Sequence, residues 1–344
     1  MRRELLAAND RKHAASGYRV LMLHPGSITA DIWFGDLAQC LRHAGIDCQV
    51  LPRATPTSGI NAAFESFAPN VFIATEANDA LQALDLPFVR RYKRERGCLR
   101  MFIPVWHAGT PGGFSTPELD EWRRRLRADG LTADTHFSLF EPEFHERFSR
   151  DRAGPAIDYV AVPQACNPFV DYPMAVAKRY DYAIASSACE ERAEVSYQFL
   201  RHILRRYRGL WAGPGWGFGA GAVPPADMPL RYSESRITLS PLASFAYLFG
   251  AELTHRVYAA AACGAFQLTM PTPITGRYFD PGELVQAASP REYVRLFDHY
   301  VDRPHERNAI ALAALRRAYG EHTCFHRIDK LVSHWDGWRR RGLF

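Results

Sequence analysis

A stretch near residue 255 combines basic side chains with a run of small ones. It reads "THRVYAAAACG" from Thr254 to Gly264. This pattern predicts a helix over residues 254–263, capped by Thr254 and ended by Gly264. The amino end of such a helix presents free N–H groups, His255 adds a donor, and Arg256 is suited to bidentate phosphate contact. We therefore expect a phosphate site here; the alternative is a packed helix whose alanines serve only the core.

The glycine-rich run "GPGWGFGAG", which starts at Gly213, has the glycine spacing of a dinucleotide fingerprint. Such a fingerprint must open a helix. Here the run "AVPPADMP" follows, so we expect a loop after a strand instead. Gly213, Gly215 and Trp216 could then line the pocket of a nucleotide base, with Trp216 as one wall. A surface loop without a ligand is the alternative.

Candidate catalytic side chains follow predicted strands in the first half of the chain. The run "HPGSITADIW" contributes His24, Gly26, Ser27 and Asp31, and His107 ends the fourth predicted strand. Ligands of open α/β sheets bind beyond the carboxyl ends of the strands, which is where these residues are expected. Gly26 and Ser27 would let a substrate approach closely, and an imidazole or carboxylate could act as a general base. For each polar residue taken alone, a purely structural role is favoured over a catalytic one.

Metal and acyl-transfer motifs are absent from the sequence. It contains no H-E-x-x-H, no P-loop, no G-x-S-x-G and no D-x-D pair of the kind that holds a divalent metal with a sugar diphosphate. We therefore expect metal-independent chemistry, no cofactor and no metal-binding residue.

The elements that must position these residues are short apolar runs alternating with helical segments. This alternation indicates parallel βαβ units, and it occurs twice along the chain. The fold class we expect is α/β, with two Rossmann-like doubly wound domains facing across a cleft. Strands are predicted within residues 18–26, 46–52, 67–76, 98–107, 132–140, 157–163, 180–188, 208–217, 235–241 and 265–270, and a helix over residues 36–45.

The chain has 344 residues, more than one hydrophobic core usually serves. A segment with three prolines and no clear period lies near its midpoint, which favours a linker there. We expect an N-terminal domain over residues 1–165, a linker over 166–179 and a C-terminal domain over 180–324. A closing helix over 325–344 is expected to pack back on the N-terminal domain.

Composition and charge narrow the class of protein. Hydrophobic residues make up 47% of the chain and charged residues 23%, as in ordinary globular proteins. The net charge of +5 comes mainly from arginine runs, which indicate solvated helix faces or attraction to an anionic membrane, a phosphorylated acceptor or nucleic acid. No run interleaves aromatics as a single-strand binding platform does, so nucleic acid is not favoured.

The cysteines and the apolar segments bear on the compartment. Seven scattered cysteines, never spaced C-x-x-C, argue against a disulfide framework. The chain shows neither the h-region of a secretory signal nor an apolar stretch long enough to span a bilayer. We expect a cytoplasmic protein, with peripheral contact to the inner membrane face as an option.

Four motifs lie in the second half of the chain. They consist of Arg256, Tyr258, Ala262-Cys263-Gly264 and Phe266; Phe279, Pro281, Gly282 and Glu283; Glu306-Arg307 with Ile310-Ala311; and His322, Thr323, Phe325 and Arg327. Over roughly residues 180–332 this set resembles the GT-B glycosyltransferases, and most of all the glycosyltransferase-like group named after spore-coat maturation proteins.

The resemblance implies a bacterial, metal-independent hexosyltransferase-like enzyme. Its donor would be a UDP or GDP sugar held by the C-terminal domain, and a glycan, lipid-linked or protein acceptor would enter from the N-terminal domain. The diphosphate would lie at Thr254–Arg256 and at the Ser186–Ser187 turn, with the base against Gly213–Trp216. If the reaction inverts the anomeric centre, Asp31 or His24 would be the base; if it retains, His107 would position the sugar.

One position departs from this group. Its members carry a glutamate directly after the aromatic residue, which grips the donor ribose, whereas this chain has Ala259. Another group such as Glu283 holds the ribose, or donor binding is altered, or catalysis is lost. The glycine usual at the second-domain turn is also replaced, by Ser186.

Four functions therefore stay open at the level of sequence. The first is a glycosyltransferase, and the second is a non-catalytic GT-B protein kept for binding, which Ala259 supports. The third is a GT-B enzyme that modifies nucleic acid, supported only by the basic charge. The fourth is a sugar-nucleotide epimerase, which no feature favours.

Overall fold

The computed structural model describes residues 1–24, 28–75, 84–103, 133–139, 158–186, 190–204, 206–213, 221, 223–240 and 253–344. The chain divides into two compact units. We call residues 6–163 and 325–344 the N-terminal unit, and residues 1–5 and 164–324 the C-terminal unit. Helix α1 (Arg2–Asn9) starts in the C-terminal unit and ends in the N-terminal one.

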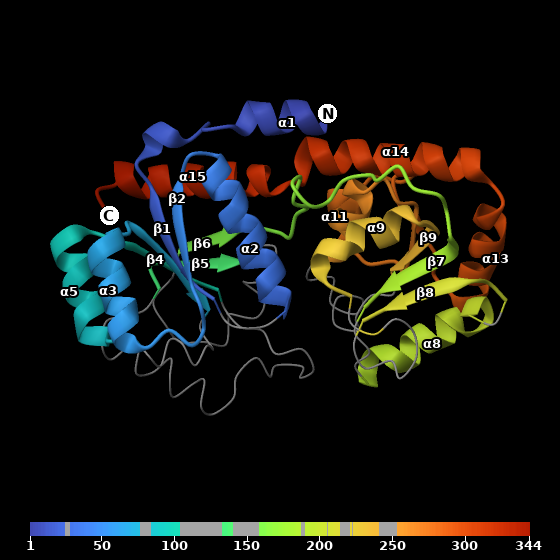
Figure 1. The fold of residues 1–344 in the computed structure, drawn as a ribbon, viewed down its shortest axis with the longest axis horizontal. Helices are drawn as coiled ribbons and strands as arrows, with labels where there is room; N and C mark the ends of the chain where they lie inside the picture. The colour runs from blue at the N-terminus through green and yellow to red at the C-terminus, as the bar shows by residue number, and fades with distance from the viewer. Residues whose placement is uncertain are drawn as a thin grey trace. The chain divides into compact units, whose positions relative to one another are not determined.

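The N-terminal unit is built on a parallel sheet whose described strands run in the order β2-β1-β3-β4-β5-β6 (Figure 1). Its strands are β1 (Arg19–Leu23), β2 (Asp47–Leu51), β3 (Val71–Thr75), β4 (Leu99–Ile103), β5 (Thr135–Ser138) and β6 (Asp158–Ala161). Its helices are α2 (Ile28–His43), α3 (Thr57–Phe67), α5 (Leu86–Arg96) and α15 (Cys324–Arg340), with a short 3₁₀ turn at Ala14–Ser16.

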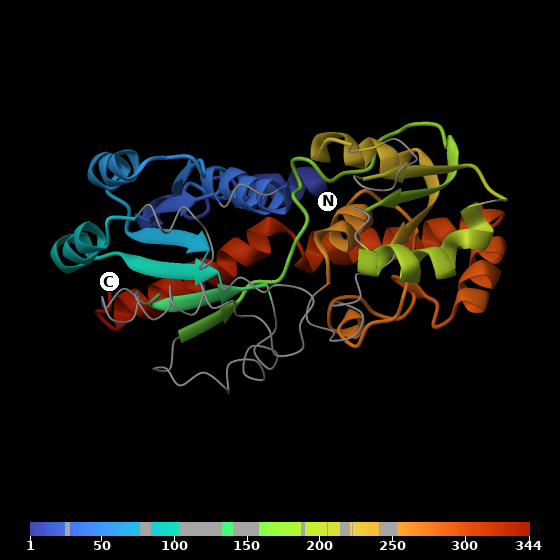
Figure 2. The same cartoon turned by 90° about the horizontal axis from the view of Figure 1, so that it is seen from below.

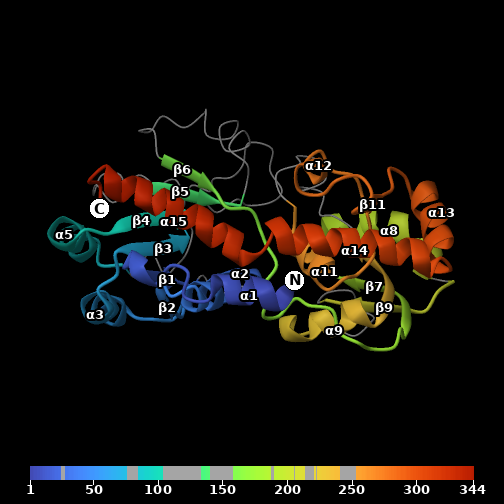
Figure 3. The same ribbon diagram turned by 90° about the horizontal axis from the view of Figure 1, so that it is seen from above.

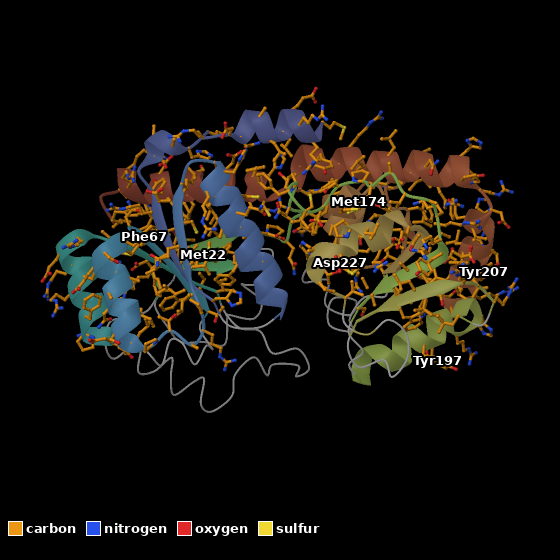
Figure 4. The ribbon with its side chains drawn as sticks, in the orientation of Figure 1. Met22, Phe67, Met174, Tyr197, Tyr207 and Asp227 are labelled. Carbon is orange, nitrogen blue, oxygen red and sulfur yellow. The ribbon has the colours of Figure 1, made fainter. Side chains whose placement is uncertain are left out.

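Helices cover both faces of this sheet. Successive side chains of a strand point to opposite faces, and buried side chains occur on both of them. Leu21 and Phe102 face α3 and α5. The neighbouring residues Met22 and Met101 are also buried, and the alternation of side chains along a strand places them on the other face. Met22 is labelled in Figure 4. There Trp335 of α15 donates from its indole nitrogen to the Met101 sulfur at 3.0 Å. The C-terminal helix is therefore part of the core of the N-terminal unit.

The C-terminal unit has a second parallel sheet, in the order β11-β10-β9-β7-β8. Figure 3 labels three of these strands, β7, β9 and β11. Its strands are β7 (Tyr180–Ala185), β8 (Gly209–Ala212), β9 (Ser235–Ser240), β10 (Gln267–Thr269) and β11 (Val285–Gln286). Its helices are α8 (Glu190–Leu204), α9 (Met228–Ser233), α11 (His255–Ala262), α12 (Thr275–Tyr278), α13 (Pro290–Val301) and α14 (Pro304–Glu321), with a 3₁₀ turn at Pro225–Asp227.

Two groups of helices sandwich this second sheet. Helices α8 and α13 share one core with Ile184, Leu239 and Leu268 of the strands. On the other side α11 packs with α12 and α14, where Tyr258 meets Tyr319 in a second core. Helix α11 thus lies against the sheet rather than at the surface, and its alanines allow this close approach.

Helix α13 has a capping motif at its amino end. Ser289 accepts a hydrogen bond from the Glu292 backbone nitrogen at 3.2 Å, Pro290 follows, and Glu292 accepts from the Ala288 backbone nitrogen at 2.9 Å. A serine cap with a glutamate three residues later satisfies amides that the helix itself cannot pair.

Ser289→Ala is therefore expected to lower the free energy of unfolding by about 1 kcal/mol, because an orphan amide loses its partner. Urea unfolding measures this change. Ser66→Ala, at an exposed position inside α3 where the hydroxyl bonds only the Ala62 carbonyl, is the matched control and should have a much smaller effect. Equal losses for the two variants would contradict the assigned cap.

The segment expected to be a linker, residues 166–179, belongs to the C-terminal unit. The Cys166 backbone nitrogen donates to the His322 carbonyl at 2.9 Å, and the Met174 backbone nitrogen donates to the Ser233 hydroxyl at 3.1 Å. Backbone groups along the segment are thus bound to elements of that unit, although it forms no helix or strand. The segment 325–344, expected to be a closing helix, belongs to the N-terminal unit.

The expected α/β architecture with two Rossmann-like parallel sheets is confirmed. One local expectation was wrong: the helix expected over residues 36–45 is α2, which begins earlier, at Ile28. Asp31 accordingly lies in the first turn of a helix. Among the described residues, no helix is long and apolar enough to cross a bilayer.

Candidate functional site

The carboxyl edge of the C-terminal sheet gathers the ends of adjacent strands. Ser186 follows β7, and its backbone nitrogen donates to the Ala212 carbonyl at 2.8 Å, at the end of β8. Gly213 comes next, with a φ of 144° that favours glycine, and its nitrogen donates to the Gly221 carbonyl at 2.7 Å. Both residues thus lie at the edge where ligands bind in open α/β sheets.

Helix α11 turns its amino end to the same edge. Thr254 has the extended backbone of an N-cap, but its side chain makes no capping hydrogen bond. Its hydroxyl oxygen is buried and has no hydrogen-bond partner among the described residues. The capping role expected of Thr254 is therefore wrong.

Arg256 connects the first turn of α11 to this edge. Its Nη1 donates to the Ala185 carbonyl oxygen at 2.5 Å, at the last residue of β7. Burial raises the pKa of Tyr232 and Tyr293, and the charge of Arg256 acts on both in the opposite direction. The guanidinium therefore reaches the carboxyl end of β7 in a partly buried position.

His255 contacts a carboxylate that the sequence did not single out. Its Nε2 lies 3.9 Å from an oxygen of Asp171, and the Asp171 side chain is only 5% exposed. The same carboxylate accepts from the Asn167 backbone nitrogen at 2.8 Å, and the Asp171 carbonyl accepts from the Tyr319 hydroxyl at 2.7 Å. Asp171 is thus a fixed, buried carboxyl group beside the amino end of α11. Its place in a segment without periodicity gave no sequence signal.

Polar side chains of β10 form hydrogen bonds to helix α11 and to the neighbouring strand β9. Gln267 donates from Nε2 to the Val257 carbonyl at 2.9 Å, and Thr269 donates from its hydroxyl to the Ser240 carbonyl at 3.0 Å. Both side chains are buried. The signal that could have found them is the presence of Gln and Thr within an otherwise apolar strand, since buried polar groups must be bonded.

Ala259 lies in an apolar environment. It is 3% exposed and belongs to a small core with Tyr232, Cys263 and Ala265, against which Ala185 and Met228 also pack. The position where the resemblance implies a ribose-binding glutamate is therefore filled by closely packed apolar groups. The departure at residue 259 extends beyond one side chain to the packing around it.

Glu283 does not lie at the carboxyl edge. It precedes β11, and all described strand pairs of this sheet are parallel, so it lies at the amino edge. Its two carboxylate oxygens accept from Arg317 Nε at 3.1 and 3.0 Å, and one accepts from the Asp280 backbone nitrogen at 2.7 Å. These contacts give Glu283 structural partners, and its role toward the donor ribose stays a prediction.

In the N-terminal unit, His24 follows β1 as expected. Its backbone nitrogen donates to the Leu51 carbonyl at 2.9 Å, and its ring packs edge-on against Phe34 with 5.6 Å between centroids. Asp31 is in α2, but its side chain lies outside the described residues. Other expected site residues also lie outside them: Gly26, Ser27, His107, Ser187, Gly215 and Trp216.

Residues 192–333 match the family model described as glycosyl transferase-like. A search of curated proteins finds no match to the chain.

Solved structures match nearly the whole chain at low identity. Sucrose-phosphate synthase from Thermosynechococcus elongatus has a TM-score of 0.64 at 10% identity, over 95% of this chain and 99% of that one. Anabaena HepE in complex with UDP and glucose has a TM-score of 0.61 at 10% identity, over 93% of this chain and 100% of that one. The DNA-modifying enzyme β-glucosyltransferase, studied with uridine diphosphoglucose, has a TM-score of 0.60 at 10% identity, over 94% of this chain and 98% of that one. The chain thus has the GT-B fold, and through residues 192–333 it is similar to the glycosyl transferase-like family.

Proposed function

We propose that this chain is a glycosyltransferase that moves a sugar from a uridine diphosphate sugar to a glycan, lipid-linked or protein acceptor. The observation that carries the proposal is the hydrogen bond from Arg256 to Ala185, which brings a guanidinium to the carboxyl edge within the family-matched segment. The choice of uridine is supported by solved structures of similar fold that were studied with UDP or uridine diphosphoglucose. A GDP sugar is the other donor to test.

The proposed mechanism follows from the charge that the leaving group develops. Departure of a nucleoside diphosphate builds negative charge on its phosphate oxygens. The amino end of α11 and the Arg256 guanidinium would stabilise that charge without a divalent metal. The reaction is then expected to continue in the presence of a chelator. For an inverting reaction, His24 or Asp31 would remove the acceptor proton; for a retaining one, His107 would position the sugar.

Thermal unfolding with added nucleotides tests donor binding. A ligand that binds only the folded protein stabilises it by mass action. We expect UDP and a UDP sugar to raise the melting temperature by several degrees at saturation, with a smaller effect of GDP and none of AMP. If no nucleoside diphosphate shifts the transition, the chain does not bind such a donor and the proposal is wrong.

A non-catalytic binding protein is the second candidate, and the packing around Ala259 favours it. Slow hydrolysis of a UDP sugar without an acceptor separates the two functions. Release of free sugar would support the enzyme. Binding of UDP without any sugar release, over a panel of UDP sugars, would support the binding protein.

A further inference from the structure

Buried polar atoms without a hydrogen-bond partner recur along one part of the C-terminal unit. Among the described residues they include the hydroxyl oxygens of Thr254 and Thr275 and the side-chain nitrogen of Gln286. Thr254 directly precedes α11, Thr275 follows β10, and Gln286 is the last residue of β11. Because β10 and β11 are adjacent and parallel, Thr275 and Gln286 belong to the carboxyl ends of neighbouring strands, where open α/β sheets bind ligands.

Thr275 is the most deeply buried of the three, with 5% of its surface exposed. Another threonine closes the turn before it: the Thr272 hydroxyl accepts from the Ile274 backbone nitrogen at 3.1 Å. The Thr275 backbone nitrogen is bonded as well, to the Thr272 carbonyl at 3.2 Å, but the Thr275 hydroxyl takes no part in this turn. A buried hydroxyl left unbonded lowers the free energy of unfolding, so a native protein that keeps one calls for a partner from outside the chain.

Gln286 brings a second such group to the neighbouring strand. It lies opposite Thr269 in the parallel pair of β10 and β11. Val285 packs against the core shared by α8 and α13, so Gln286, the next residue, points to the other face, on which α11, α12 and α14 pack. Thr269 shares that face, and its hydroxyl is bonded to the Ser240 carbonyl at 3.0 Å. The Gln286 nitrogen has no comparable bond among the described residues.

The two unbonded threonines adjoin one core. The residues directly before them, Leu253 and Ile274, both belong to the core of α11, α12 and α14. In the same core the ring of Tyr258 from α11 packs edge-on against Tyr278 from α12, with 5.9 Å between centroids. Figure 2 shows α11 between α9 and α12 within the C-terminal unit. The first turn of α11, which carries Arg256, is therefore packed with the helix that carries Thr275.

The chemistry of these atoms fits a neutral ligand that carries hydroxyl groups. A threonine hydroxyl both donates and accepts hydrogen bonds, and the Gln286 nitrogen donates. None of these side chains is charged, in contrast to Arg256. The oxygens of a diphosphate only accept hydrogen bonds and pair best with a guanidinium. Sugar hydroxyls donate as well as accept, so they match the uncharged groups; a buried water molecule has the same chemistry, and the experiment below separates the two.

We propose that Thr275 and Gln286 bind hydroxyl groups of the donor sugar, beside the diphosphate at Arg256, and thereby select the sugar. This inference rests on the proposed function, because it assigns the sugar part of the same donor. A side chain that finds its hydrogen-bond partner in the ligand discriminates against a sugar without the matching hydroxyl, since that sugar leaves a buried group unpaired.

Binding measurements with and without the sugar test the assignment. Calorimetric titration gives Kd for UDP and for UDP-glucose, UDP-galactose and UDP-N-acetylglucosamine, and hence the ratio of Kd for the preferred UDP sugar to Kd for UDP. Thr275→Val and Gln286→Leu should each raise this ratio by about tenfold, the effect of one lost hydrogen bond, while Kd for UDP stays at the parental value. The preference among the three sugars should shrink by a similar factor.

The ligand-free chain gives a second readout with the opposite sign. Thr275→Val is expected to keep or raise the melting temperature, because a methyl group of the same shape replaces a hydroxyl that has no partner. Thr238→Val is the matched control. The Thr238 hydroxyl is also buried and unbonded among the described residues, but Thr238 lies inside β9, opposite Gln267 and not at the strand end. It should have the same effect on the melting temperature and leave every Kd at the parental value.

The outcomes separate this inference from the function on which it rests. If the parent chain binds UDP but Thr275→Val and Gln286→Leu leave the ratio of Kd values unchanged, the unbonded groups hold water and the sugar assignment is wrong. A lower melting temperature of ligand-free Thr275→Val, or an equal rise of the ratio in Thr238→Val, would overturn it as well. If the parent chain binds no nucleoside diphosphate, the proposed function itself fails and the sugar assignment with it.

Discussion

Arg256→Ala is expected to lower kcat/KM for a UDP-sugar donor by about 100-fold or more, the size of the effect when a preorganised donor to a developing anion is removed. Arg256 is the described cation that reaches the carboxyl edge from α11, through its hydrogen bond to Ala185. Its contribution should grow in the transition state, because the diphosphate gains negative charge as the glycosidic bond breaks. Steady-state kinetics with a UDP sugar, or donor hydrolysis, measure the loss.

Two further variants separate charge from geometry. Arg256→Lys keeps the charge but loses the planar fork, so part of the activity should survive. Glu283→Gln is the control. Glu283 is also a motif residue, but its carboxylate accepts hydrogen bonds from Arg317 and does not lie at the carboxyl edge of the sheet. It should keep the kinetic constants of the parent chain. Full activity of Arg256→Ala would remove the phosphate role from α11, and a loss in Glu283→Gln as large as in Arg256→Ala would return the ribose role to Glu283.

Strong local signals in the sequence predicted much of the C-terminal unit. The apolar runs near residues 180, 209 and 267 became β7, β8 and β10, and the small-residue run became α11. These elements have clear periodicity, and each is bounded by a turn residue such as Gly264, whose φ of 65° requires glycine. The place of Arg256 in the first turn of α11 could be predicted because local structure fixes the position of a residue at a helix start.

The surroundings of several residues depend on longer-range structure. Strand β11 has only two residues, and therefore no period to reveal that Glu283 precedes a strand. Asp171 lies in a segment without regular structure, and only the packing of α11 and α14 brings it beside His255. The burial of Ala259 likewise depends on Tyr232, which is distant in sequence. Tertiary contacts decide such positions, and local pattern does not encode them.

Ala259→Glu is expected to lower the free energy of unfolding by about 3 kcal/mol, since it adds volume and a charge to a packed apolar cluster. Ala259 is 3% exposed, and its neighbours Tyr232, Cys263 and Ala265 are buried as well. Restoring the family glutamate should therefore destabilise the chain and weaken UDP binding. Urea unfolding and calorimetric titration with UDP measure the two effects.

The matched control is Ala62→Glu, which adds the same side chain at an exposed position of α3 and should change stability little. Ala259→Ser tests a polar group without the added volume and should be milder than the glutamate. A contrary outcome would be an Ala259→Glu chain with parental stability and tighter UDP binding. That result would show that the carboxylate reaches the donor from residue 259, in a pocket still shaped for the ribose. The expected result would instead show that the packing of Tyr232 against α11 has closed this route, so that any donor must be held by Arg256 and its neighbours at the carboxyl edge.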